Sequence, residues 1–270
     1  MLAPVSPRTP PTRVALFIPC YIDQLYPGVG WAALELLEAH GITADILDDQ
    51  TCCGQPLINT GAVAAAQPLF ERFAATFRDH EHVVCPSGSC CATLRRGLLH
   101  APSPSTRPAV YELCEFLVDV LGVERIEASF PHRVALHQSC HALRELGLGQ
   151  PSELGGGAAR RENPGRKLLL SLRDLTLVEP ERADECCGFG GSFCITEASL
   201  SGRMGRDRVD DLARSGATVV TSLDMSCLMH LSGVSRRERR PLAFMHIAEV
   251  LAGRTVPPEA AAETAPEARA

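Results

Sequence analysis

The sequence contains few aromatic residues and lacks the long apolar segments of membrane proteins. Phe, Trp and Tyr make up 5% of the 270 residues, and nowhere is there an apolar run of the roughly 18 residues that a membrane-spanning helix needs. The first residues, MLAPVSPRTPPTR, are rich in proline and lack the apolar core of a secretory signal. The sequence therefore predicts a cytoplasmic protein with no membrane span.

Charge of one sign is not concentrated anywhere in the chain. The net charge is −6, and the one basic cluster, residues 236–240, is interrupted by Glu238. This cluster is weak as a nucleic-acid-binding stripe and favours a solvated loop or a docking patch for an acidic partner. With 45% apolar and 21% charged residues, the composition is that of a globular protein, which excludes disorder of the whole chain. No nucleic-acid partner is predicted.

Cysteine, in contrast, is abundant. The chain has 12 cysteines, and a reducing cytoplasm keeps thiols free. A cysteine-rich chain in that compartment more often binds metal or performs catalysis than forms a disulfide scaffold.

The cysteines follow an internal repeat. Residues 13–20, RVALFIPC, share five of eight letters with residues 133–140, RVALHQSC. An apolar run that ends in a cysteine predicts a buried strand with a thiolate at its carboxyl end. In both halves the same features then follow in order: Cys-Cys-Gly (52–54; 186–188), a helical stretch (61–78; 196–215), a valine-rich strand (82–85; 218–221) and Ser-Cys (89–90; 226–227).

This order predicts the fold class. Short apolar strands that alternate with helices indicate βαβ units with parallel strands. We therefore expect an α/β protein with an internally duplicated cysteine-rich domain, in which two Rossmann-like parallel-sheet halves are related by a pseudo-twofold axis. The repeats cover residues 13–125 and 131–252, and the tails at 1–12 and 253–270 are expected to be disordered. A glycine-rich insertion at 149–165 predicts a surface loop.

Four cysteines recur in each half and are the candidate ligands. Four thiolates suit either a structural zinc or an iron–sulfur cluster. Zinc sites usually use C-x₂₋₄-C pairs, whereas adjacent cysteines point in different directions, which favours the larger cluster. The candidate ligands are Cys20, Cys52, Cys53 and Cys90 in the first half and Cys140, Cys186, Cys187 and Cys227 in the second.

Four further cysteines lie outside the repeat. Cys85, Cys91 and Cys194 are within a few residues of repeated cysteines and are alternatives for a missing ligand. Cys114 lies on an apolar helical face, which predicts a small buried hydrophobic residue.

Two histidines flank Cys140 and have no equivalents around Cys20. His137 and His141 are candidates for a proton relay coupled to electron transfer, or for hydrogen-bond donors to sulfur. The alternative is that they are ordinary polar residues at a strand end.

Several short sequence motifs resemble those of known families. Each half resembles the cysteine-rich CCG domain of heterodisulfide reductase B-subunits and glycolate oxidase iron–sulfur subunits, and residues 13–252 resemble the lactate utilization protein A family. The resemblance implies a role in oxidising L-lactate to pyruvate, with a ferredoxin-type iron–sulfur partner subunit and an accessory lactate-utilization subunit. The matching phrases are Cys52–Pro56, Pro86–Cys90, His137–His141, Cys186–Gly191 and Met245–Leu251.

One departure from the resembled motif affects the expected cofactor. The motif of heterodisulfide reductases ends in Cys-x-x-Cys, but Ser87 and Asp224 stand at the first of these positions. The cofactor is therefore expected to be a [4Fe–4S] cluster of cubane or non-cubane type, with one or two per chain. Two alternatives remain: a thiol/disulfide redox subunit of the heterodisulfide reductase type, and a zinc-stabilised scaffold without catalysis.

Overall fold

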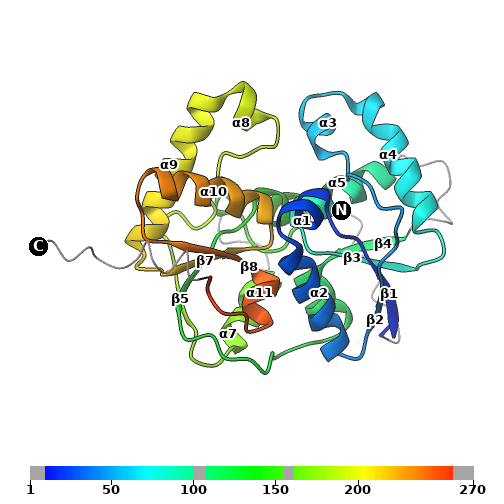
Figure 1. Ribbon diagram of the computed structural model, residues 1–270, viewed down its shortest axis with the longest axis horizontal. Helices are drawn as coiled ribbons and strands as arrows, with labels where there is room; N and C mark the ends of the chain where they lie inside the picture. Colours follow the sequence, from blue (N-terminus) through cyan, green and yellow to red (C-terminus); the bar gives the residue numbers. More distant parts are fainter. Residues whose placement is uncertain (1–9, 100–107, 155–160, 258–270) are drawn as a thin grey trace, which may run out of the picture.

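The computed structural model describes residues 10–99, 108–154 and 161–257. These residues form two four-stranded parallel sheets with helices packed around them (Figure 1). The two predicted tails lie mostly outside the described residues, and so does the middle of the glycine-rich insertion.

The first sheet has the strand order β2-β1-β3-β4. Residues 82–85 were predicted as a strand, and all four residues of β3 are buried, as expected for a central strand covered on both faces. The strands are β1 (Arg13–Leu16), β2 (Thr43–Asp45), β3 (His82–Cys85) and β4 (Ala109–Glu112). The helices are α1 (Cys20–Leu25), α2 (Pro27–Ala39), α3 (Gln55–Asn59), α4 (Val63–Thr76), α5 (Gly88–Leu98), α6 (Leu113–Glu115) and the π-helix η2 (Phe116–Val120).

The second sheet repeats this order as β6-β5-β7-β8, again with every pairing parallel. The predicted duplicated α/β fold is therefore confirmed. The strands are β5 (Arg133–Leu136), β6 (Thr176–Val178), β7 (Val219–Ser222) and β8 (Ala243–His246). The helices are η3 (His141–Glu145), η4 (Ser152–Leu154), α7 (Pro164–Ser171), α8 (Phe193–Thr196), α9 (Ala198–Arg214), α10 (Met225–Arg237) and α11 (Ile247–Leu251).

Some element boundaries differ from the sequence-based expectation. The strands expected to end at Cys20 and Cys140 end at Leu16 and Leu136, and the two cysteines instead stand at the starts of the following helices, α1 and η3. The helix expected over 196–215 is observed as α9, and the short helix α8 precedes it. The last part of the predicted glycine-rich loop is helical, because the Asn163 side chain accepts a hydrogen bond from the backbone of Arg166 and caps α7.

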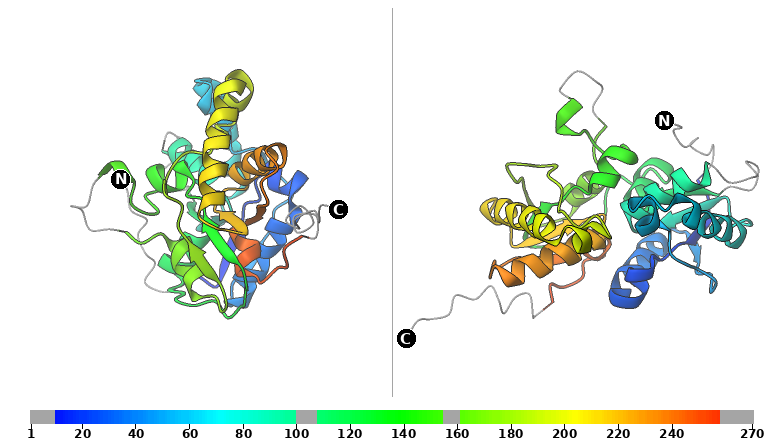
Figure 2. Two further views of the ribbon diagram at one scale, coloured as in Figure 1. Left: turned by 90° about the vertical axis from the view of Figure 1, so that its left-hand side faces the viewer. Right: turned by 90° about the horizontal axis from the view of Figure 1, so that it is seen from above.

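Hydrophobic packing crosses between the two halves. Helix α11 of the second half packs against α2 of the first, and α7 packs against α6 and η2. One cluster of buried side chains accordingly includes Leu36 and Leu37 from α2 together with Ile247, Val250 and Leu251 from α11. On the opposite side of the sheets, α3–α4 and α8–α9 rise from the two halves in the same direction (Figures 1 and 2).

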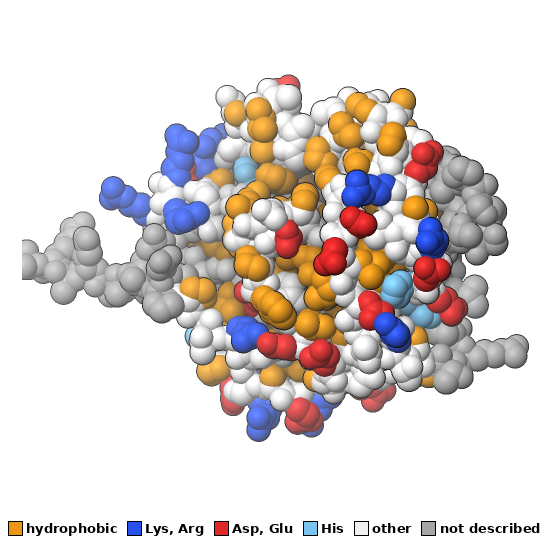
Figure 3. Space-filling model, turned by 45° about the vertical axis from the view of Figure 1, so that its right-hand side comes forward, with side chains coloured by type: hydrophobic (Ala, Val, Ile, Leu, Met, Phe, Trp, Pro, Cys, Tyr) orange, Lys and Arg blue, Asp and Glu red, His pale blue; other side chains and the backbone are white. Residues whose placement is uncertain are grey.

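The surface mixes charges of both signs. On the face drawn in Figure 3, basic and acidic side chains are interspersed with hydrophobic ones. Among the helices of the described ranges, none is both long and apolar enough to cross a bilayer.

An ion pair at the edge of the first sheet predicts a pH-dependent contribution to stability. Asp45 on β2 accepts hydrogen bonds from Arg13 (2.6 Å) and from His80 (2.9 Å), which hold its pKa at about 2. A carboxyl group whose pKa is lowered by folding stabilises the folded state at pH values above its unfolded pKa. This stabilisation is lost as the pH falls. Because Arg13 is largely exposed, we expect Asp45→Asn to lower the free energy of unfolding by only about 1 kcal/mol at pH 7.

Urea denaturation at several pH values tests this expectation. The difference between wild type and Asp45→Asn should be constant from pH 7 to 5 and shrink below about pH 4, where the unfolded carboxyl group is protonated. Asp49→Asn is the control, because Asp49 pairs with Arg72 at 3.8 Å between two exposed side chains. A difference for Asp45→Asn that stays the same down to pH 3 would contradict the assignment.

Candidate functional site

The first group of candidate ligands lies at the switch point of the first sheet. The chain leaves β1 for β2 on one side and for β3 and β4 on the other, so a crevice forms beyond the carboxyl ends of β1 and β3. Cys20 begins α1 directly after β1, and Cys90 is in the first turn of α5 after β3. Cys52 and Cys53 reach the same place from the segment between β2 and α3.

The structure brings these four thiols together. The sulfur atoms of Cys53 and Cys90 are 3.2 Å apart, and Cys52 exchanges hydrogen bonds with both Cys20 and Cys53. The backbone N–H of Gly54 also points at the Cys52 sulfur, at 3.4 Å. All four cysteines predicted for the first half therefore form one continuous group.

The second half repeats the arrangement. Cys186 hydrogen-bonds with Cys140 and Cys187, and Cys187 in turn hydrogen-bonds with Cys227. The backbone N–H of Gly188 lies 3.4 Å from the Cys186 sulfur, and that of the next residue lies 3.5 Å from the Cys187 sulfur. The second set of predicted ligands is thus also assembled.

Hydrogen bonds among the thiols lower the pKa of some of these cysteines and raise the pKa of others. Bonds from neighbouring thiols lower the pKa of Cys52 and of Cys186 to about 2. The same bonds, together with burial, raise the pKa of Cys20 and Cys53, and likewise of Cys140 and Cys187. The thiolate form is thus favoured at Cys52 and Cys186, and a bound cation would displace protons from the other thiols. Four sulfurs with backbone N–H groups directed at them suit an iron–sulfur cluster. Among the described residues, only His137, Cys187 and Cys227 lie close enough together to hold one small ion such as zinc.

The glycine of each Cys-Cys-Gly motif predicts a difference between the halves. Gly54 and Gly188 both have φ of +85°, a conformation that costs an L-residue about 1–2 kcal/mol. A Cβ atom at Gly54 would meet only side chains at 3.5 Å or more, whereas at Gly188 it would lie 2.7 Å from Met204 and 2.9 Å from the backbone oxygen of Ser201. We expect Gly54→Ala to cost about 1–2 kcal/mol of stability and Gly188→Ala about 3–4 kcal/mol, because only the latter adds a steric clash. Chemical denaturation of the two variants measures this, and equal losses would contradict it.

The remaining cysteines lie outside the two sulfur groups. All twelve cysteines are free. Cys85, Cys91 and Cys194 each donate to a backbone carbonyl oxygen, at 3.0–3.7 Å. Cys114 is fully buried in the core, as predicted, and burial raises its pKa.

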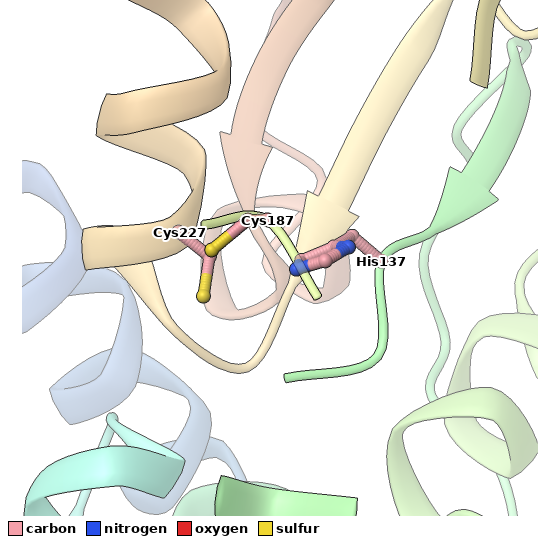
Figure 4. Close-up of side chains that lie close together, drawn as sticks. All are labelled: His137, Cys187 and Cys227. Atoms are coloured by element: carbon pink, nitrogen blue, oxygen red, sulfur yellow. The ribbon is translucent and has the colours of Figure 1, made fainter. Parts of the chain in front are cut away.

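His137 lies directly beside the second group. Its side chain is buried, and one ring nitrogen is within 4.8 Å of the sulfur atoms of Cys187 and Cys227 (Figure 4). Nδ1 accepts a hydrogen bond from Nε of Arg208 at 3.1 Å. Burial and the charge of Arg208 lower the pKa of His137 to about 3, so the ring is neutral at physiological pH.

His141 connects the two groups. Its Nδ1 is 3.5 Å from the Cys140 sulfur, and its Nε2 is 3.4 Å from the amide nitrogen of Gln55, the residue that follows the first Cys-Cys-Gly. The carboxylate of Glu145 lies 3.7 Å from Nε2 and is partly exposed. The loops that hold the two cysteine groups therefore touch across the interface of the halves.

The two positions that depart from the resembled motif meet each other. The Ser87 hydroxyl donates to Asp224 at 2.8 Å, although 137 residues separate them. Asp224 also accepts from the backbone N–H of Ser89 at 3.0 Å and from the hydroxyl of Ser139. Because Asp224 is fully buried, these hydrogen bonds join the halves next to both sites.

Arg208 was not among the residues predicted to contribute to a site. This arginine lies in a strongly charged stretch of α9 and is nonetheless fully buried. Its position along the helix could have predicted its burial, because it lies on the same buried face as Gly205, Val209 and Leu212.

A cavity opens beside the first group. It has a volume of about 470 Å³ and is lined by Cys20, Cys52, Gln50 and the carboxylates of Asp23 and Asp48. Cys20 is itself exposed. The first sulfur group can therefore be approached from solvent.

Comparison with known proteins agrees with this duplicated architecture. A family described as a cysteine-rich (CCG) domain matches the chain twice, at residues 14–95 and 134–232. Lactate utilization protein A of Bacillus subtilis (strain 168) is 38% identical over 251 residues, which cover 90% of this chain and 100% of that protein. The protein of the same name from Exiguobacterium is 38% identical over 249 residues, 88% of this chain and 96% of that protein.

A solved structure shares the fold. A hypothetical protein from Helicobacter pylori superposes with a TM-score of 0.63 at 11% identity, covering 96% of this chain and 53% of the other. At that identity the similarity concerns the fold alone.

Proposed function

Because the chain belongs to the lactate utilization protein A family and carries the cysteine-rich domain twice, we propose that it is an iron–sulfur electron-transfer subunit in the oxidation of L-lactate to pyruvate. The observation that carries the proposal is the pair of four-thiol groups, one at the switch point of each sheet. We assign one cluster site to each group, with Cys20, Cys52, Cys53 and Cys90 as ligands in the first half and Cys140, Cys186, Cys187 and Cys227 in the second.

The residues around the sulfurs suit this cofactor. When bound, a [4Fe–4S] cluster of either cubane or non-cubane type accepts and releases one electron at a time. Cys53, Cys90, Cys187 and Cys227 are buried and would keep water from the inner side of each site. The glycines that follow each Cys-Cys pair leave room for backbone N–H groups to bond to sulfur.

Two sites match the electron count of the reaction. Oxidation of lactate to pyruvate releases two electrons and two protons, so two one-electron sites, linked through His141 and Gln55, would hold the pair until an acceptor takes it. We assign proton uptake to His141, which lies between the Cys140 sulfur and the partly exposed Glu145. His137 is too deeply buried to exchange protons with solvent.

The proposal includes partner subunits. Exposed Cys20 and the cavity beside it provide a place where a ferredoxin-type iron–sulfur partner could approach the first site. An accessory lactate-utilization subunit completes the proposed complex.

A reconstituted assay tests the function. The chain, purified without oxygen, is combined with a ferredoxin-type protein and an accessory protein of a lactate-utilization system, and reduction of a dye is followed after addition of L-lactate. We expect turnover that requires all three proteins and falls to background with Cys187→Ser. Equal turnover without this chain would contradict the proposal.

Zinc is the second candidate, because His137, Cys187 and Cys227 are close enough to hold one small ion. A protein that binds zinc and no iron would be a scaffold and would not transfer electrons.

A further inference from the structure

His137 has one ring nitrogen that is buried and has no partner among the described residues. The side chain is 1% exposed, and Nε2 makes no hydrogen bond there. Figure 4 shows the nitrogen farther from the backbone, which is Nε2, directed toward Cys187 and Cys227. An unpaired buried polar atom is costly, so this geometry points to a bond with whatever occupies the sulfur group.

The other ring nitrogen determines what kind of bond Nε2 can make. Nδ1 faces Nε of Arg208 at 3.1 Å, and an arginine side chain can only donate. Nδ1 must therefore accept, which places the proton of the neutral imidazole on Nε2. A metal-ligating histidine has the opposite arrangement, in which the second nitrogen donates to a carboxylate or carbonyl oxygen.

Hydrogen bonds fix the Arg208 side chain, so that it keeps His137 in this tautomer. Its Nη1 donates to Asp211 at 3.1 Å and to the backbone oxygen of Arg182 at 2.5 Å, and its Nη2 donates to Ala183 at 3.3 Å. All three nitrogens are thus occupied in a fully buried side chain.

We propose that Arg208 holds His137 in the tautomer that donates its Nε2–H to sulfur in the second cluster site, and that His137 raises the reduction potential of that centre without being a ligand. Hydrogen bonds to sulfur stabilise the more negative, reduced state. This inference rests on the proposed iron–sulfur function. His137 touches the site, whereas Arg208 is a positioning residue.

The equivalent position of the first half carries no such donor. At the offset that pairs Cys20 with Cys140, the residue equivalent to His137 is Phe17, whose ring packs edge-on against Phe73 and Phe77. The two sites, although built from the same repeat, therefore differ in the donor at this position.

Variants of His137 separate a donor from a ligand. Wild type, His137→Leu and His137→Gln are purified without oxygen, and iron, sulfide and the reduction potentials of both centres are measured. Glutamine can donate from its amide and accept from Arg208, so it should restore what leucine removes. Because Asp224 also lies near Cys227 and stays in place in all three proteins, its contribution cancels.

We expect full iron in all three proteins. In His137→Leu the reduction equilibrium of one centre should shift about tenfold toward the oxidised state, which is about 59 mV for one electron. His137→Gln should lie close to wild type. Arg208→Met should shift the same centre in the same direction, and the double variant with His137→Leu should shift it by less than the sum of the two.

The outcomes are distinct. Loss of about half of the iron from both His137 variants would show that His137 is a ligand, and full iron with unchanged potentials would show that it makes no bond to the centre. Either result would overturn the inference while leaving the iron–sulfur function in place. Zinc in place of iron in the wild type would overturn the proposed function and this inference with it.

Discussion

Replacing Cys187 with serine is expected to remove about half of the iron from the protein. The Cys187 thiol bonds to both Cys186 and Cys227 and is 3% exposed. A serine hydroxyl stays protonated where a thiol would ionise, so it cannot replace a thiolate ligand. With one [4Fe–4S] centre per half, iron should fall from about eight to about four per chain.

Cys53→Ser is the matched variant in the first half. It should remove the other centre, so that the double variant retains almost no iron. Cys114→Ala is the control, because Cys114 is fully buried in the core outside both sulfur groups. Full iron in both Cys53→Ser and Cys187→Ser would contradict the assignment of the ligands.

Replacing Asp224 with alanine is expected to destabilise the protein by about 3–5 kcal/mol. Asp224 is the N-cap residue of α10, but its side chain makes no capping hydrogen bond to that helix. It accepts hydrogen bonds from Ser87, Ser89 and Ser139 instead. These donors are buried, and each one left without an acceptor costs about 1–3 kcal/mol. The expected loss is smaller than the full sum over these donors, because the serine hydroxyls can rotate to other acceptors.

Asp224→Asn is a sharp control for this stability effect. The asparagine oxygen can still accept from Ser87 and Ser89, and the Ser139 hydroxyl can rotate to accept from the new amide. We expect a loss of about 1 kcal/mol, measured by denaturant unfolding of the metal-free proteins. Equal and small losses for alanine and asparagine would mean that the Asp224 hydrogen bonds contribute little to joining the halves.

The fold was predictable because the repeat specifies it locally. A short apolar run forms a buried parallel strand wherever helices cover both faces, and the sequence contains two such series in the same order. The strand at 82–85 and the glycine-rich Cys-Cys-Gly segments required no knowledge of distant contacts. The cysteine groups followed from the rule that parallel sheets bind ligands at their switch points.

The contacts between the halves were not predictable in this way. Ser87 and Asp224 attracted attention only because they stand where the resembled motif has cysteine, and nothing in the sequence indicated that they bond to each other. Their pairing depends on how two helix starts meet across the interface, which is a property of packing. The same limit applies to Gln55 and His141, which are 86 residues apart.

Arg208 shows a second limit of the sequence. A charged side chain on a charged helix normally faces solvent. Its burial depends on Asp211 and on two backbone carbonyl oxygens that reach it from the segment before Cys186. Only the assembled second half provides these partners.

The measurement that tests the central claim most directly is the content of iron and acid-labile sulfide per chain, taken with absorption and EPR spectra on protein purified without oxygen. Two cluster sites predict about eight iron and eight sulfide, with broad absorption near roughly 400 nm from sulfur-to-iron charge transfer. Zinc at one or two per chain, with no visible absorption and no sulfide, would contradict the account and identify the cysteine groups as structural.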